Sequence, residues 1–215
     1  MSHQFRELNI DVVIDGKTQS ISSQRRTEFV ELYKLDELIP QRYSEVLVVD
    51  LLVDLELNGN DPAHIVDEIK HLELLGSVGF TKKASQFKHI PLHPLWHQHY
   101  FSVRHLIPNI QNELRRNYDT IWKESTGNAA PVNDPKIIAN LINDLIQGSV
   151  ERRSDEQRIT GEWLVFSENS LGNIYLCTAK HGQGDQNIYD KIKYSCQHEF
   201  PMLEPFASDR QRSNL

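Results

Sequence analysis

Histidine is concentrated in one short stretch of the chain. Residues 87–105 contain half of the ten histidines of this 215-residue sequence: His89, His93, His97, His99 and His105. Imidazole titrates near neutral pH and is the commonest metal ligand in proteins, so this clustering has chemical meaning. The same stretch contains Trp96 and Tyr100, and such a polar and aromatic composition suits a purely apolar core poorly. We therefore expect residues 87–105 to carry part of a functional site.

The spacing of His93, His97 and His99 allows two arrangements. On a helix His93 and His97 share a face, whereas on an extended segment His97 and His99 share one. One backbone geometry does not easily serve both pairs, and no His-Glu-x-x-His or Cys-x-x-Cys motif accompanies them. The pattern favours metal-free acid–base chemistry or substrate binding. A site for zinc or another divalent metal and a structural role remain as alternatives.

A second histidine, His181, follows the strongest strand signal in the sequence. It lies in residues 180–185 (Lys-His-Gly-Gln-Gly-Asp), between a predicted strand and a predicted helix. Glycine-rich turns of this kind expose backbone N–H groups that suit anions, although the spacing is not that of a P-loop or a dinucleotide motif. We expect His181 to act as a general base and Lys180 to stabilise negative charge.

Several neighbouring residues are expected to bind the substrate or to have a structural role. Asp185 is either a substrate contact or the N-cap of the last helix, and Tyr189 faces the same cleft or packs in the core. Trp96 and Tyr100 could stack on a nucleobase, although aromatic residues among apolar neighbours are more often core. Arg104 completes the predicted substrate contacts.

Two further pairs of residues have side chains that could do chemistry. Asp50 and Asp54 are either paired carboxylates or the solvated side of a helix, and the four-residue spacing favours the second. Cys177 lies inside a predicted strand and Cys196 inside a predicted helix, so neither is expected to be an activated thiol.

The composition predicts a soluble globular protein. Hydrophobic residues make up 39% of the chain and charged residues 25%, and no apolar run is long enough to span a membrane. The first residues lack the profile of a secretory signal, and two cysteines favour a reducing compartment, so we expect a cytoplasmic protein. The net charge of −7 gives no global attraction to nucleic acid, although basic pairs such as Lys82–Lys83 allow a local phosphate-binding patch.

The pattern of apolar and turn residues predicts an α+β fold. It consists of an N-terminal hairpin and helices, central helices, and a C-terminal two-strand-plus-helix unit that contributes to a small antiparallel sheet. The predicted hairpin covers residues 8–21 with a turn at Asp15-Gly16, and Ser23 is the predicted cap of the first helix. The remaining predicted elements are helices over 24–40, 43–57, 61–76, 96–105, 106–122, 137–148 and 187–199, an extended segment over 88–92, and strands over 161–166 and 173–179.

Three functional regions follow from this order. Residues 1–80 are predicted to form a helical and hairpin scaffold or regulatory lobe, residues 81–205 a catalytic α+β domain, and residues 206–215 a flexible tail. The acidic character of the first region suits an inhibitory or partner-binding role.

The order of C-terminal segments resembles that of a known class of proteins. These segments are Gly-Glu-Trp-Leu-Val-Phe (161–166), Asn-Ile-Tyr-Leu-Cys-Thr-Ala-Lys-His-Gly (173–182) and a helix over 185–200. Together they are similar to the small RNA-cleaving toxins of the barnase, EndoU, colicin and RelE-like class. That resemblance implies strand, turn, strand, a histidine-bearing loop and a closing helix. It also implies metal-free catalysis by His181, Lys180 and a second histidine from His93, His97 or His99.

Three functional hypotheses result. The leading one is a cytoplasmic, metal-independent ribonuclease of toxin or phage-defence type, with RNA as substrate, an inhibitor or antitoxin as protein partner, and no membrane association. The second is a metal-dependent hydrolase whose ligands are His93, His97, His99 and His181. The third is an acidic immunity or antitoxin-like binding protein, with histidines scattered over its surface.

Overall fold

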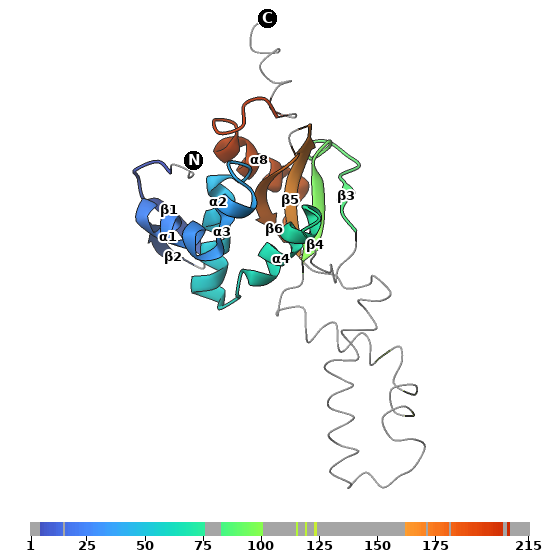
Figure 1. Ribbon diagram of the computed structural model, residues 1–215, viewed down its shortest axis with the longest axis horizontal. Helices are drawn as coiled ribbons and strands as arrows, with labels where there is room; N and C mark the ends of the chain where they lie inside the picture. Colours follow the sequence, from blue (N-terminus) through green and yellow to red (C-terminus); the bar gives the residue numbers. More distant parts are fainter. Residues whose placement is uncertain are drawn as a thin grey trace, which may run out of the picture. The chain divides into compact units, whose positions relative to one another are not determined.

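The computed structural model describes residues 5–14, 16–75, 83–100, 162–170, 172–180 and 182–203, together with Arg115, Asp119, Lys123 and Phe206 (Figure 1). The fold is α+β, as predicted: helices accompany a two-stranded hairpin and a four-stranded sheet of order β3-β4-β5-β6. Contacts group residues 1–78, 84–98 and 162–215 in one compact unit and residues 79–83 and 99–161 in another. Within the described part of the chain, no helix combines the length and apolar character needed to cross a membrane.

The N-terminal hairpin and the first helix are formed as predicted, with small shifts. Strands β1 (Ile10–Ile14) and β2 (Lys17–Ile21) pair antiparallel, with Gly16 in the left-handed conformation at the turn. Helix α1 (Ser23–Tyr33) is capped by Ser22, whose hydroxyl accepts from the Arg25 N–H, so the predicted cap at Ser23 was one residue late. Lys34 ends α1 well before residue 40, and the short helix α2 (Leu35–Leu38) follows.

Helices α3 and α4 match their predicted segments. Ser44 caps α3 (Glu45–Asn58) by accepting from the Leu47 N–H at 3.0 Å, and Gly59 ends it in the left-handed conformation. Pro62 occupies the cap position of helix α4 (Ala63–Leu72), and Asp61 Oδ1 accepts from the Ala63 N–H at 2.9 Å. This helix ends before the predicted stop at residue 76.

The histidine-rich stretch forms a strand where a helix was predicted. Strand β3 (Ser85–Gln86) pairs antiparallel with β4 (Trp96–Tyr100), and Ser85 lies opposite His97. The helix predicted from residue 96 is therefore wrong for residues 96–100, because cross-strand pairing and the β-preference of Trp and Tyr outweigh a weak helical periodicity. Residues 88–92 were predicted to be extended, but His89 is a bend and residues 90–94 form turns, with cis bonds before Pro91 and Pro94.

The C-terminal strands and helix confirm the predicted unit. Strands β5 (Glu162–Asn169) and β6 (Gly172–Ala179) pair antiparallel with a bulge at Val165/Phe166, and both are longer at the turn than predicted. Helix α8 (Asp185–Cys196) begins two residues early and lies beside β6 (Figure 1). Most of the central helices predicted at 106–122 and 137–148 falls outside the described residues. Arg115 and Asp119, within the first of them, are helical and exposed.

The outer edge of β6 is covered by the segment that leads into α3. The Ser44 N–H donates to the Tyr175 carbonyl at 2.9 Å, and the Tyr175 N–H donates to the Arg42 carbonyl at 2.8 Å. Tyr43 and Tyr175 thereby form a parallel β-bridge. Because a free strand edge would attract other chains, this cover protects the edge and fixes α3 against the sheet.

The core that supports the sheet is shared between β5, β6, α8 and the turn before β4. Its fully buried members include Leu92, Leu176, Cys177, Ile192 and Cys196. The buried apolar residues of the histidine-rich segment fix its backbone against the core, and the backbone in turn sets the positions of its polar side chains.

Candidate functional site

His97 is a half-buried residue of β4 whose ring is held on three sides. Its ring centroid lies 4.6 Å from that of Phe87 and 5.0 Å from that of Trp163. Its Nε2 atom lies 3.2 Å from the Ser85 hydroxyl oxygen, across the β3–β4 pair. Two aromatic walls and one hydrogen bond restrict the ring to one orientation, which is what an acid–base histidine requires.

A row of residues leads from His97 across the sheet to the end of β6. Trp163, which contacts His97, lies opposite Ala179, the last residue of β6. Lys180 follows directly and is exposed; its backbone N–H donates to Gln183 Oε1 at 3.2 Å and its carbonyl accepts from the Gln183 N–H at 3.1 Å. His181, the residue after Lys180, lies outside the described residues.

The start of α8 differs from the prediction for Asp185. Gly184 occupies the cap position with φ of 85°, Asp185 is the first helical residue, and no side chain caps this helix among the residues that the structure describes. The predicted N-cap role of Asp185 is therefore wrong, and its exposed carboxylate is left beside the glycine turn. Tyr189 packs against the core and lies 5.7 Å from Lys193 Nζ, in agreement with the core interpretation.

The other predicted site residues lie apart from this row or outside the description. His93 is exposed in the turn before β4, where its Nδ1 lies 3.1 Å from the Phe87 carbonyl oxygen. His99 and Tyr100 are buried at the end of β4, while Arg104 lies outside the described residues. Among the residues described, no group of three His, Cys, Asp or Glu side chains is arranged to hold a metal ion.

Trp96 lines a cavity of about 530 Å³. Its ring stacks on Phe166, with centroids 6.4 Å apart and planes 23° from parallel. The cavity is also lined by the β5–β6 turn and by residues on either side of the sheet, namely Gln86, Pro94, Ser167, Glu168, Asn169, Ser170, Met202 and Leu203. Of the predicted substrate contacts, Trp96 is thus one that lines a cavity.

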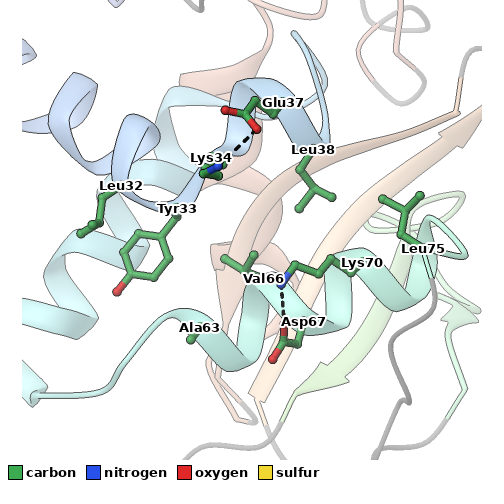
Figure 2. A pocket seen from close by; sticks show the side chains of 10 residues that line it. All are labelled: Leu32, Tyr33, Lys34, Glu37, Leu38, Ala63, Val66, Asp67, Lys70 and Leu75. Carbon is green, nitrogen blue, oxygen red and sulfur yellow. Dashed lines mark hydrogen bonds and ion pairs between the residues drawn. The ribbon is translucent and has the colours of Figure 1, made fainter.

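A second hollow lies between α1, α2 and α4. It has a volume of about 480 Å³ and mostly apolar walls, and Figure 2 shows Leu32, Leu38, Val66 and Leu75 around it. Ion pairs between neighbouring residues of one segment lie at its rim: Lys34 with Glu37 at 3.7 Å and Lys70 with Asp67 at 2.8 Å. Its charges are therefore already paired on the protein.

An ion pair that the sequence reading missed links three elements. Lys191 Nζ lies 2.6 Å from Asp50 Oδ2, and the same carboxylate accepts from the Thr178 N–H at 2.9 Å. Burial lowers the pKa of Lys191, but the attraction of Asp50 outweighs it and the pKa is raised. The solvated helix face predicted for Asp50 is wrong. The sequence carries no signal of this pairing, because Asp50 and Lys191 are 141 positions apart.

The two cysteines beside this ion pair confirm the expectation of inert thiols. Both are free and buried, and burial raises the pKa of the Cys177 thiol to about 12 and that of the Cys196 thiol still further. A thiol of such a high pKa carries almost no thiolate at neutral pH, so it is a poor nucleophile.

A second charged cluster joins the N-terminal segment, α3 and the residues after α8. Glu45 lies 2.7 Å from Arg6 and 3.2 Å from the fully buried Arg26. Glu199 Oε2 accepts from the Glu45 N–H at 3.0 Å, and burial raises the pKa of Glu199 to about 7. Sequence reasoning did not find this cluster, because its members are separated by long stretches of chain.

The described residues thus bring His97, Ser85 and Trp163 together on the sheet whose strand β6 directly precedes Lys180. His93 lies apart from these residues in a turn, where its Nδ1 is within hydrogen-bond distance of the Phe87 carbonyl oxygen. The chain matches no protein-family model, no curated protein and no solved structure.

Proposed function

We propose that the protein is a metal-independent ribonuclease in which His97 and His181 are the acid–base pair and Lys180 offsets negative charge on the phosphate. The observation that carries the proposal is the row formed by His97, its ring contact Trp163 and the strand partner Ala179, which directly precedes Lys180. General acid–base catalysis needs two titratable groups on either side of one reacting phosphate. His97 lies near the start of β4 and Lys180 directly follows the end of β6, so one sheet would support the catalytic groups.

The reaction is a transphosphorylation. One histidine removes the proton of the ribose 2′-hydroxyl, whose oxygen then forms a bond to the adjacent phosphorus. The bond from phosphorus to the 5′-oxygen of the next nucleotide breaks, and the other histidine donates a proton to that oxygen. The products are a 2′,3′-cyclic phosphate and a free 5′-hydroxyl. The Lys180 ammonium would stabilise the negative charge that develops on the phosphate oxygens.

The surroundings of His97 suit this role. The Ser85 hydroxyl, 3.2 Å from Nε2, and the rings of Phe87 and Trp163 hold the plane of the imidazole. His97 is half-buried, and because its Nδ1 is buried, Nε2 beside the Ser85 hydroxyl is the nitrogen that would exchange a proton with the substrate. Neighbouring groups that fix the tautomer and orientation are a general requirement for catalytic histidines.

The test is cleavage of a single-stranded RNA oligonucleotide by the purified chain in the presence of a chelator. We expect a product with a 2′,3′-cyclic phosphate, and no cleavage of the same oligonucleotide carrying 2′-deoxyribose at the scissile position. His97→Ala and His181→Ala should each lower the rate about 100-fold or more. His198→Ala, which changes an exposed histidine after α8, is the matched control and should leave the rate unchanged.

The same assay separates the alternatives. Activity that disappears with the chelator and returns with zinc would favour the metal-dependent hydrolase. Absence of cleavage, together with a basic protein bound in a defined stoichiometry, would favour the immunity-like binding protein, since the chain carries a net charge of −7.

A further inference from the structure

The cavity at Trp96 combines an aromatic platform with polar groups. Phe166 supports one face of the Trp96 ring at a centroid distance of 6.4 Å, so the plane of the ring is fixed before any ligand binds. The amide of Gln86 is also fixed, because its nitrogen donates to the Pro94 carbonyl at 2.9 Å. Residues 167–170 (Ser-Glu-Asn-Ser) add two hydroxyls, an amide and a carboxylate to the same cavity. A cavity of about 530 Å³ is in the size range of small-molecule sites.

The charges of the residues that line this cavity determine which class of ligand it can bind. Among the described residues around this cavity there is no lysine or arginine, and Glu168 contributes a negative charge. Phosphate groups would be repelled here, whereas a flat, uncharged ring with hydrogen-bonding edges would stack on Trp96 and bond to the amides and hydroxyls. Nucleobases have this chemistry.

We propose that the Trp96 cavity binds an unpaired nucleobase of the RNA substrate and so restricts the protein to single-stranded RNA. This inference rests on the proposed ribonuclease activity for the identity of the ligand. A base in a duplex has its edge paired and its faces stacked, so it could not enter. The base is recognised by stacking and by its polar edge, and the phosphate contacts are left to other residues.

The position of the cavity relative to His97 supports this arrangement. Trp96 and His97 are consecutive in β4, so their side chains point to opposite faces of the sheet. On the two-residue strand β3, Ser85 contacts His97 and Gln86 lines the cavity. The face that carries Trp96 and the face that carries His97 therefore both border the short sheet edge formed by β3. A single strand that crosses this edge can place one base on Trp96 and a nearby phosphate at His97.

The test is binding of the four nucleosides, which carry no phosphate, to the full chain by isothermal titration or ligand-observed NMR. At least one nucleoside should bind, and Trp96→Ala should weaken it about 5- to 100-fold, the range expected for loss of one base stack. Trp96→Phe keeps an aromatic face and should weaken binding by less than about 5-fold. Leu32→Ser, at the hollow between α1 and α4, is the control and should change nothing.

A second variant keeps the test decisive if Trp96→Ala does not fold. Glu168 is exposed, so Glu168→Gln should leave the fold intact and change the order of affinity among the four nucleosides, since an acceptor is replaced by a mixed donor and acceptor. Unchanged binding in both variants, binding of inorganic phosphate or of a simple sugar in preference to nucleosides, or no nucleoside binding by the wild-type chain would overturn the inference.

The outcome is distinguishable from that of the proposed function. If nucleosides bind through Trp96 but RNA is not cleaved, the ribonuclease proposal fails and a base-binding site remains. If RNA is cleaved and Trp96→Ala leaves KM for single-stranded RNA and the preference over duplex RNA unchanged, the base site fails and the ribonuclease proposal remains.

Discussion

At the scale of single residues, His97 owes its orientation to Ser85. The hydroxyl lies 3.2 Å from Nε2 and is supplied by the neighbouring strand, so it holds the orientation of the ring, whose other nitrogen, Nδ1, is buried. We predict that Ser85→Ala lowers kcat for RNA cleavage about 3- to 10-fold with little change in KM, because a single neutral hydrogen bond is lost. Steady-state kinetics as a function of pH provide the measurement. Ser85→Thr should restore most of the rate, and a loss confined to KM would contradict a positioning role.

Glu199 is a second residue with a testable property. Its pKa is raised from 4.5 to about 7 by burial, so between these pH values the folded protein holds a proton that the unfolded chain releases. The contribution of protonated Glu199 to the free energy of unfolding is therefore lost as the pH rises from 4.5 to about 7. We predict that the unfolding free energy of the wild type falls by about 1–3 kcal/mol between pH 5 and pH 8 through this group.

Glu199→Gln isolates this effect. The glutamine side-chain oxygen can still accept from the Glu45 N–H but does not ionise. Urea denaturation of the variant near pH 5 and near pH 8 should show a smaller decrease than the wild type. Glu7→Gln, at an exposed position, is the control. An identical pH dependence in Glu199→Gln and the wild type would rule out Glu199 as its source.

At the scale of elements, one ion pair joins α3, β6 and α8. Asp50 in α3 accepts from Thr178 in β6 and from Lys191 in α8. Lys191→Met keeps the apolar stem and removes the charge, leaving a partly buried carboxylate without its cation. We predict a loss of about 2–3 kcal/mol in unfolding free energy, below the value for a fully buried pair because both side chains retain some exposure.

The double variant checks the origin of that loss. Asp50→Leu with Lys191→Met removes both charges, and the cost should be smaller than the sum of the two single changes. Chemical denaturation of the four proteins of this cycle gives the coupling energy. Simple additivity would show that Asp50 and Lys191 have no coupling energy.

The start of β6 has a backbone requirement that only glycine meets. Gly172 has φ of 111°, and an added Cβ would lie 2.6 Å from Arg42 Nη1, whose guanidinium is held by Glu73 at 2.6 and 3.0 Å. We predict that Gly172→Ala costs about 2–3 kcal/mol, from an unfavourable backbone conformation and a displaced ion pair. Gly59→Ala, with positive φ but open space around the new atom, should cost only about 1 kcal/mol. Thermal and urea unfolding compare the two, and equal losses would exclude the Arg42 contact as a cause.

At the scale of the whole molecule, the sequence was sufficient for the fold class and for most elements. The hairpin, α3 and the β5–β6–α8 unit were predictable because turn residues and apolar periodicity act locally. Strand β4 was missed because its partner β3 lies ten residues away and is only two residues long. Local patterns contain no information about such pairing, and tertiary contacts decide it.

The site was only partly predictable for the same reason. His97, Trp96 and Lys180 stand out by residue type; the first two lie on β4, and Lys180 directly follows β6 of the same sheet. Ser85 and Phe87 carry no signal of their own, and they join the site through strand pairing and packing. Only their burial in the structure distinguishes Asp50 and Lys191 from ordinary solvent-exposed charged residues. The division of the chain at residue 80, the role of His181 and the cellular setting stay predictions.

The most direct test of the account is the rate of RNA cleavage, with chelator present, for the wild type, His97→Ala, His181→Ala and the double variant. We predict a 2′,3′-cyclic phosphate product for the wild type and a loss of about 100-fold or more in each single variant. The double variant should lose little more than either single one, because the two residues act on the same phosphate. Cleavage at the wild-type rate in the double variant would contradict the central claim.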